Sequence, residues 1–125
     1  MHFDGVDKIE TLAAASGFSI FELSPKQDQS LILPNSYHVT PTQTKDSTSE
    51  SIKKDDIEKA FEVANKKQEK DFFIVIERAE LLTHSSENKI LKQLEEPGQN
   101  LHYVFLTTNA TLLLPTIKSR AFCYV

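Results

Sequence analysis

The chain has 125 residues, of which 39% are hydrophobic and 26% charged; this predicts one globular domain over residues 1–125 and excludes the disordered and fibrous classes. Its formal net charge of -4 argues against a protein that binds nucleic acid with its whole surface, because neutralising phosphates requires clustered Lys and Arg. The single cysteine, Cys123, excludes an intramolecular disulfide and fits a reducing compartment. No apolar stretch approaches the roughly 20 residues that span a bilayer, so we expect a cytoplasmic protein without membrane contact.

The first part of the chain predicts a helix followed by short strands. Val6 to Ser16 carries apolar residues at helical spacing and is followed by Gly17, which predicts a short amphipathic helix. Phe18 to Leu23 alternates apolar and polar residues, as a strand does. Ser30 to Leu33 and Tyr37 to Thr40 are two further strand candidates, and the sequence leaves open which of these runs pair.

A polar segment and a helix come next. Pro41 to Ser51, with the sequence PTQTKDSTSES, contains no apolar residue, so we expect a solvated loop that adds nothing to the core. Asp55 and Glu58 then form a capping-box pattern. Apolar residues at helical spacing follow, and they predict a helix from Asp55 to about Lys67.

Two strongly apolar strands frame the next helix. Every residue from Phe72 to Ile76, FFIVI, is apolar, which predicts a central strand covered on both faces. Thr83 is expected to cap a helix that Pro97-Gly98 end. Leu101 to Thr107 predicts a second buried strand.

The end of the chain completes an alternation of strands and helices. Pro115 fits the first turn of a short helix within Leu112 to Lys118, and Ala121 to Val125 predicts a final strand. Alternation of this kind implies right-handed crossovers between parallel strands. The predicted fold class is therefore α/β, a three-layer α/β/α sandwich with a mostly parallel sheet.

Polar residues follow the second apolar strand. The strand ends in Thr107, and Thr108 and Asn109 come directly after it. Open α/β sheets bind their ligands outside the carboxyl ends of the strands. These side chains therefore indicate a present or former ligand site.

Three segments of the second half of the chain form a recognisable series: Glu77 to Pro97 (ERAELLTHSSENKILKQLEEP), Phe105 to Asn109 (FLTTN) and Leu112 to Arg120 (LLLPTIKSR). In this order they resemble the nucleotide-binding domain of the bacterial DNA polymerase III clamp loader, a AAA+ ATPase family, and within it the delta-prime and gamma/tau subunits. The resemblance covers roughly residues 52 to 125, and the first 50 residues match poorly.

The resemblance implies that FFIVIE is the Walker B strand, whose terminal carboxylates position magnesium and the water that attacks ATP. Glu77 stands at the first acid position and Arg78 at the next, and a longer acid followed by a cation disfavours magnesium. Thr108 or Asn109 matches the sensor position, which touches the γ-phosphate in active members. We therefore expect these four residues to be remnants of a nucleotide site, with no cofactor and no metal bound.

A phosphate-binding loop is missing from the sequence. Such a loop needs a Gly-x-x-x-x-Gly-Lys pattern, and none of the three glycines, Gly5, Gly17 and Gly98, lies in one. Many active clamp-loader subunits also carry a four-cysteine zinc module, which Cys123 alone cannot form. The resemblance therefore implies a AAA+ core that has lost its phosphate-binding loop.

Ser119-Arg120 matches the family's Ser-Arg-Cys motif, with Ala121 in place of the cysteine. The resemblance implies that Arg120 is an arginine finger offered to the ATP of a neighbouring subunit, where a guanidinium neutralises charge on the transferred phosphoryl group. The first hypothesis is therefore a non-catalytic, delta-prime-like subunit of DNA replication. Its implied partners are the gamma/tau and delta subunits, with the sliding clamp and primer-template DNA reached through the assembly.

Two other functions stay open. One is a weak ATPase with an atypical phosphate site, for which Lys26 and Glu77 are available. The other is a small protein-interaction domain that docks partners through Pro41 to Ser51. The family continues past its Ser-Arg motif into a helical lid and collar, whereas this sequence ends at Val125, so both a fragment and a reduced protein fit.

Overall fold

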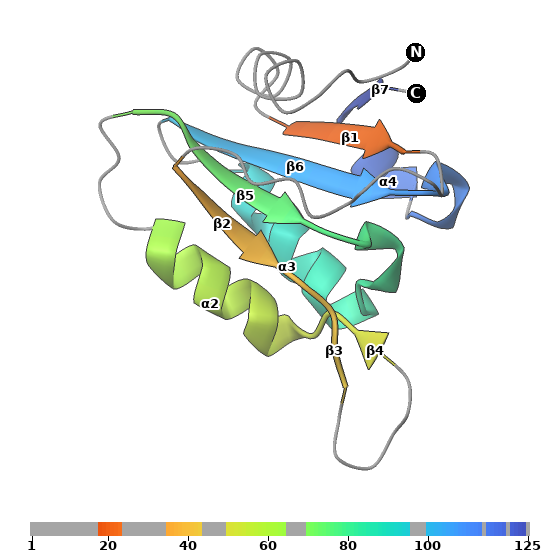
Figure 1. Ribbon diagram of the computed structural model, residues 1–125, viewed down its shortest axis with the longest axis horizontal. Coiled ribbons are helices and arrows are strands. Elements are labelled where there is room, and N and C mark those ends of the chain that lie inside the picture. The colour runs from red at the N-terminus through yellow and green to blue at the C-terminus, as the bar shows by residue number, and fades with distance from the viewer. Residues whose placement is uncertain are drawn as a thin grey trace.

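The structure of the protein is a computed structural model that describes residues 18–23, 35–43, 50–64, 70–95, 100–113, 115–119 and 121–124. Five strands form one sheet in the order β2-β5-β6-β1-β7 (Figure 1). Their bounds are β1 (Phe18–Glu22), β2 (Ser36–Val39), β5 (Phe72–Ile76), β6 (Leu101–Thr107) and β7 (Phe122–Tyr124).

Every pair of neighbouring strands in this sheet is parallel, as the alternation of strands and helices predicts. The predicted bounds of β5 and β6 are confirmed to the residue, and β1, β2 and β7 lie within one or two residues of their predicted ranges. The predicted helix from Val6 to Ser16 and the strand candidate from Ser30 to Leu33 lie outside the described residues.

Among the described residues, three helices accompany the sheet: α2 (Lys54–Ala64), α3 (His84–Glu95) and the short α4 (Pro115–Lys118). α2 and α3 pack against each other (Figure 1), and the Lys89 ammonium of α3 donates a hydrogen bond to Glu58 of α2 at 3.1 Å. Pro115 is the first residue of α4, as predicted, because its missing N–H is not needed in the first turn.

Alternate residues of the strands enter a core that the helices cover. It joins Ile74 and Tyr103 of the sheet with Ile57 of α2, Ile90 of α3 and Ile117 of α4. The strand side chains of the opposite face are buried too, each at most 2% exposed: Phe21, Phe73, Val75, Val104 and Leu106. Both faces of the sheet are therefore buried, as the predicted three-layer arrangement requires.

The two long helices begin differently from each other. Thr83 caps α3 as predicted, because its hydroxyl accepts the Ser86 N–H at 3.2 Å. The predicted cap of α2 is wrong: the helix begins at Lys54, and the Asp56 carboxylate accepts the Lys53 N–H at 3.0 Å. The expected capping glutamate, Glu58, points instead toward α3.

The polar segment from Pro41 to Ser51 is more ordered at its ends than we predicted. There β3 (Thr42–Gln43) and β4 (Glu50–Ser51) pair antiparallel, beyond the end of β2 (Figure 1). The pairing uses only backbone groups, so it needs none of the apolar residues on which the loop prediction depended.

Ile52 fixes the base of this β3–β4 pair to the start of α3. Its side chain is fully buried, and its N–H donates to the Leu81 carbonyl at 2.9 Å. Its own carbonyl accepts the Thr83 N–H and the Ser86 hydroxyl, both at 3.0 Å. The short segment after β5 is thus tied to β4.

Tyr103 carries a polar atom into the middle of the core. The residue is 2% exposed, and its hydroxyl has no hydrogen-bond partner in the part of the chain that the structure describes. Burial accordingly raises the pKa of the phenol. Its ring packs edge-on against Phe61, with the ring centroids 6.4 Å apart.

Replacing Tyr103 by Phe should therefore stabilise the protein by about 1 kcal/mol, since it removes an unsatisfied buried hydroxyl and keeps the ring. Urea unfolding followed by circular dichroism measures the difference. Lower stability of Tyr103→Phe than of the wild type would mean that the hydroxyl is paired in solution.

The buried carboxyl of Glu87 should make the free energy of unfolding depend on pH. Burial raises the pKa of its carboxyl above the ordinary value of 4.5, and the neighbouring His84 opposes the rise. Because the folded state holds this proton more tightly than the unfolded chain, the stabilising contribution is complete below the ordinary pKa and is lost as the pH rises through the folded-state pKa. Glu87→Gln cannot ionise, so it should be more stable than the wild type at neutral pH.

This advantage of Glu87→Gln should shrink as the pH falls and should be smallest below 4.5, where the wild-type carboxyl is protonated in both states. Urea unfolding across this pH range measures it. Glu62→Gln, at an exposed position of α2, is the matched control and should change little. A constant difference between wild type and Glu87→Gln at all pH values would contradict the prediction.

Candidate functional site at the carboxyl edge of the sheet

The ends of the parallel strands meet at one edge, which we call the carboxyl edge. Glu77 follows β5 and donates its N–H to the Val39 carbonyl at the end of β2, at 3.0 Å. The Thr107 carbonyl at the end of β6 accepts the Leu23 N–H beyond β1, at 2.8 Å. Because β5 pairs with β6, the four predicted site residues that follow these strands all lie in the two connections that leave this edge: Glu77, Arg78, Thr108 and Asn109.

Glu77 lies against a histidine of the neighbouring strand. Its Oε2 is 3.4 Å from Nδ1 of His38, and the two side chains are 14% and 21% exposed. A carboxylate only accepts hydrogen bonds, so this contact requires a proton on Nδ1 of the imidazole. The predicted first acid of the Walker B position is therefore engaged within the chain.

Arg78 turns away from the strand ends. Its backbone is left-handed, with φ 51° and ψ 54°, which is uncommon for a residue other than glycine. Its guanidinium binds the Glu50 carboxylate of β4, and both side chains are partly exposed. At the second acid position the chain thus has a cation that is paired with the β3–β4 pair.

The end of β6 is held by a carboxylate that the sequence analysis missed. Glu80 lies in a short 3-10 helix, η1 (Ala79–Leu81), and its Oε2 accepts the Thr107 hydroxyl at 2.8 Å. Thr107 is fully buried, and its Oγ1 also accepts the Asn109 N–H at 3.1 Å. The corner after β5 is thereby bonded to the corner after β6.

The predicted sensor residues differ in what they contact. Asn109 is exposed, and its Oδ1 accepts the Thr111 N–H at 3.1 Å, which starts a second 3-10 helix, η2 (Ala110–Leu112). Thr108 is half-buried, and its hydroxyl has no partner among the described residues. The Asn109 side chain therefore serves the local turn.

Arg120, the predicted arginine finger, lies outside the described residues. The residues before it are well anchored. Ile117 of α4 is fully buried, and Ser119 donates its N–H to the Pro115 carbonyl at 2.9 Å and its hydroxyl to the Thr116 carbonyl at 3.0 Å.

The carboxyl edge offers little to a metal ion. In the described part of the chain, no group of three or more His, Cys, Asp or Glu side chains is arranged to hold a metal. The acids present at the edge, Glu77 and Glu80, each contact a different side chain of the protein, His38 and Thr107. On a separate question, no helix of the described residues is both long enough and apolar enough to cross a membrane.

Sequence reasoning missed His38, Glu50 and Glu80 as members of this edge. His38 lies within the predicted strand from Tyr37 to Thr40, and its place beside Glu77 follows from the pairing of β2 with β5. Glu50 lies in a segment expected to be a solvated loop. Glu80 carried no signal of its own, because its bond to Thr107 joins residues 27 positions apart.

The parallel sheet, and the likeness to clamp-loader proteins in sequence and structure, identify the class: a clamp-loader-like AAA+ subunit. The family model described as DNA polymerase III, delta subunit, matches residues 23–125, and the chain belongs to this family.

Individual relatives agree with this assignment. DNA polymerase III subunit gamma/tau of Mycobacterium bovis and of Mycobacterium tuberculosis are each 38% identical to the chain over 50 residues, which is 40% of this chain and 9% of each relative. The crystal structure of a DNA polymerase III, gamma subunit-related protein from Thermotoga maritima superposes with a TM-score of 0.74 at 26% identity. That match covers 98% of this chain and 45% of the solved one, so the chain spans less than half the length of these relatives.

The bond between Thr107 and Glu80 should contribute to stability. Thr107→Val keeps the shape of the side chain but removes a buried hydroxyl that makes two hydrogen bonds, so it should lower the free energy of unfolding by about 2 kcal/mol. Chemical unfolding measures the loss. Thr108→Val, one residue along and half-buried, is the control and should stay within about 0.5 kcal/mol of the wild type. Equal effects of the two substitutions would contradict a special role for Thr107.

Proposed function

We propose that the chain is a non-catalytic, delta-prime-like subunit of a clamp loader in DNA replication. It binds no ATP itself and completes the ATP site of a neighbouring subunit with Arg120. Its partners are other clamp-loader subunits of the gamma/tau and delta kinds, and it acts in the cytoplasm.

The observation that carries this proposal is the state of the carboxyl edge. Glu77 contacts His38, Arg78 binds Glu50, and Thr107 donates to Glu80. The side chains at both Walker B acid positions, Glu77 and Arg78, are thus paired within the chain itself. A nucleotide would have to break these bonds before gaining its own, which lowers its affinity.

The sequence supports the same conclusion from the phosphate side. Binding a triphosphate needs converging backbone N–H groups from a glycine-rich loop and a lysine. The whole sequence contains three glycines and no Gly-x-x-x-x-Gly-Lys pattern. Arg78 also places a cation where the Walker B position needs a carboxylate.

Arg120 is the residue through which such a subunit still takes part in ATP hydrolysis. It follows Ser119 at the end of an anchored segment, in which Ile117 is buried in the core and Ser119 makes two hydrogen bonds to α4. An anchored base favours the finger role, because a guanidinium must be held in place to stabilise charge developing in another subunit's active site.

Replacing Arg120 by Ala should slow the ATP turnover of the reconstituted clamp loader by about 10-fold or more, since arginine fingers in GTPases contribute ~10³ to 10⁵ in rate. Steady-state phosphate release measures it. Lys118→Ala, two residues earlier on α4, is the matched control and should retain turnover. Unchanged turnover in Arg120→Ala would reject the finger role.

Isothermal calorimetry on the isolated chain provides the companion measurement. Titration of the chain with ATP and magnesium should give no heat of binding, even when ATP reaches about millimolar concentration. Saturable binding of ATP would favour the alternative, a weak ATPase with an atypical phosphate site.

A further inference from the structure

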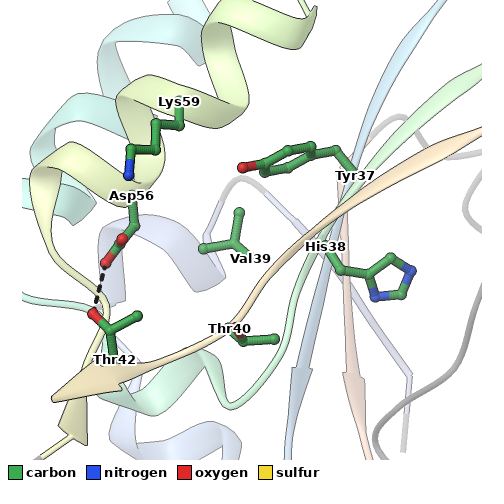
Figure 2. A pocket seen from close by; sticks show the side chains of 7 residues that line it. All are labelled: Tyr37, His38, Val39, Thr40, Thr42, Asp56 and Lys59. Carbon is green, nitrogen blue, oxygen red and sulfur yellow. Dashed lines mark hydrogen bonds between the residues drawn. The ribbon is translucent and has the colours of Figure 1, made fainter.

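A polar hollow lies between the edge strand β2 and the start of α2, and we call it the β2–α2 hollow (Figure 2). Its volume is about 140 Å³. Its lining comes from Tyr37, His38, Val39, Thr40, Thr42, Asp56 and Lys59. The ring of His38, which contacts Glu77, points away from it (Figure 2), so the hollow is separate from the carboxyl edge.

Two hydrogen-bond donors of the hollow are unused. Neither the Tyr37 hydroxyl nor the Lys59 ammonium has a partner among the described residues. Both side chains reach toward the same space in Figure 2, Tyr37 from β2 and Lys59 from α2. The other lysine at the start of α2, Lys54, pairs with Glu58 at 3.8 Å and does not line the hollow.

The acidic residue of the hollow, Asp56, accepts hydrogen bonds from other residues. Asp56 Oδ2 accepts the Lys53 N–H at 3.0 Å and the Thr42 hydroxyl at 3.4 Å. Asp56 forms no ion pair within 4.0 Å with Lys59 in this part of the structure. The carboxylate therefore caps the helix, and it forms no direct ion pair with the ammonium.

These donors fit a ligand of limited charge and size. An ammonium and a phenol hydroxyl that have no hydrogen-bond partner among the described residues favour an anionic oxygen. The Asp56 carboxylate disfavours a doubly charged phosphate at the same place, whereas a carboxylate with one charge is balanced by Lys59. A cavity of about 150 Å³ holds a molecule the size of benzene, so this hollow takes one side chain.

We propose that the β2–α2 hollow receives the carboxylate of an Asp or Glu side chain from a neighbouring clamp-loader subunit. A free small acid would gain only a partly exposed ion pair, which is too weak for stable occupancy. A side chain carried on a protein surface adds the rest of an interface. The inference rests on the proposed function for its partner and on the hollow for its chemistry.

The test is a zero-length cross-link in the assembly. A carbodiimide activates a carboxyl group, and the lysine amine attacks it, so that an amide forms between the two side chains and the activating group leaves as a urea. In the complex with gamma/tau and delta subunits, mass spectrometry should find Lys59 joined to an Asp or Glu of another subunit. Lys59→Arg should abolish this cross-link, because a guanidinium does not form the amide.

Binding measurements give an independent readout. Lys59→Glu should weaken association with the other subunits by about 10-fold or more, because it puts a second carboxylate where one is received. Lys54→Glu, one turn earlier on the same helix, should bind like the wild type. Circular dichroism and thermal melting establish that both variants are folded.

Three results would overturn the inference. One is a Lys59 cross-link found only within the chain or only to a second copy of it. Another is equal binding by Lys59→Glu and Lys54→Glu. The third is failure of the wild-type chain to bind the other subunits, which would overturn the proposed function as well.

ATP turnover and cross-linking test the Arg120 finger and the β2–α2 hollow independently of each other. Unchanged ATP turnover in Arg120→Ala, together with the Lys59 cross-link, would reject the finger role and support the hollow. Slowed turnover in Arg120→Ala without the cross-link would reject the hollow alone.

Discussion

The parallel pairing of β5 with β6 is the constraint on which the carboxyl edge depends. Its register runs from Phe72 opposite Leu101 to Ile76 opposite Phe105, so the chain leaves β5 beside the end of β6. Because these strands are buried on both faces, a shift of register would expose apolar side chains or bury polar ones. Core packing therefore fixes which polar residues meet at the edge, whether or not a nucleotide binds there.

Given this fixed geometry, loss of a ligand leaves polar groups that still need partners. Buried polar atoms without hydrogen bonds are costly, and Thr107 at the end of β6 is fully buried. The chain supplies Glu80 for Thr107, His38 for Glu77 and Glu50 for Arg78. These contacts support the proposal that the chain binds no ATP, because they satisfy its own polar groups within the fold.

The sequence predicted most of the sheet because the relevant signals are local. FFIVI is apolar at every position, Thr83 directly precedes its helix, and Pro115 can stand only in a first turn. Family resemblance added the place of Glu77, Arg78, Thr108 and Asn109. The partners of the edge were not predictable, since they join residues 27 to 39 positions apart through tertiary contacts. The β3–β4 pair was missed because backbone pairing leaves no apolar pattern.

The β3–β4 pair is attached to the start of α3 at Ile52, mainly through hydrogen bonds of the Ile52 backbone. Its N–H and carbonyl bond Leu81, Thr83 and Ser86, and every amino acid except proline carries the same two groups. Only an apolar side chain at position 52 is demanded in addition. Substitutions, insertions and deletions in the polar segment before Ile52 can therefore change its composition and length. The β3–β4 pair would still stay attached to the start of α3.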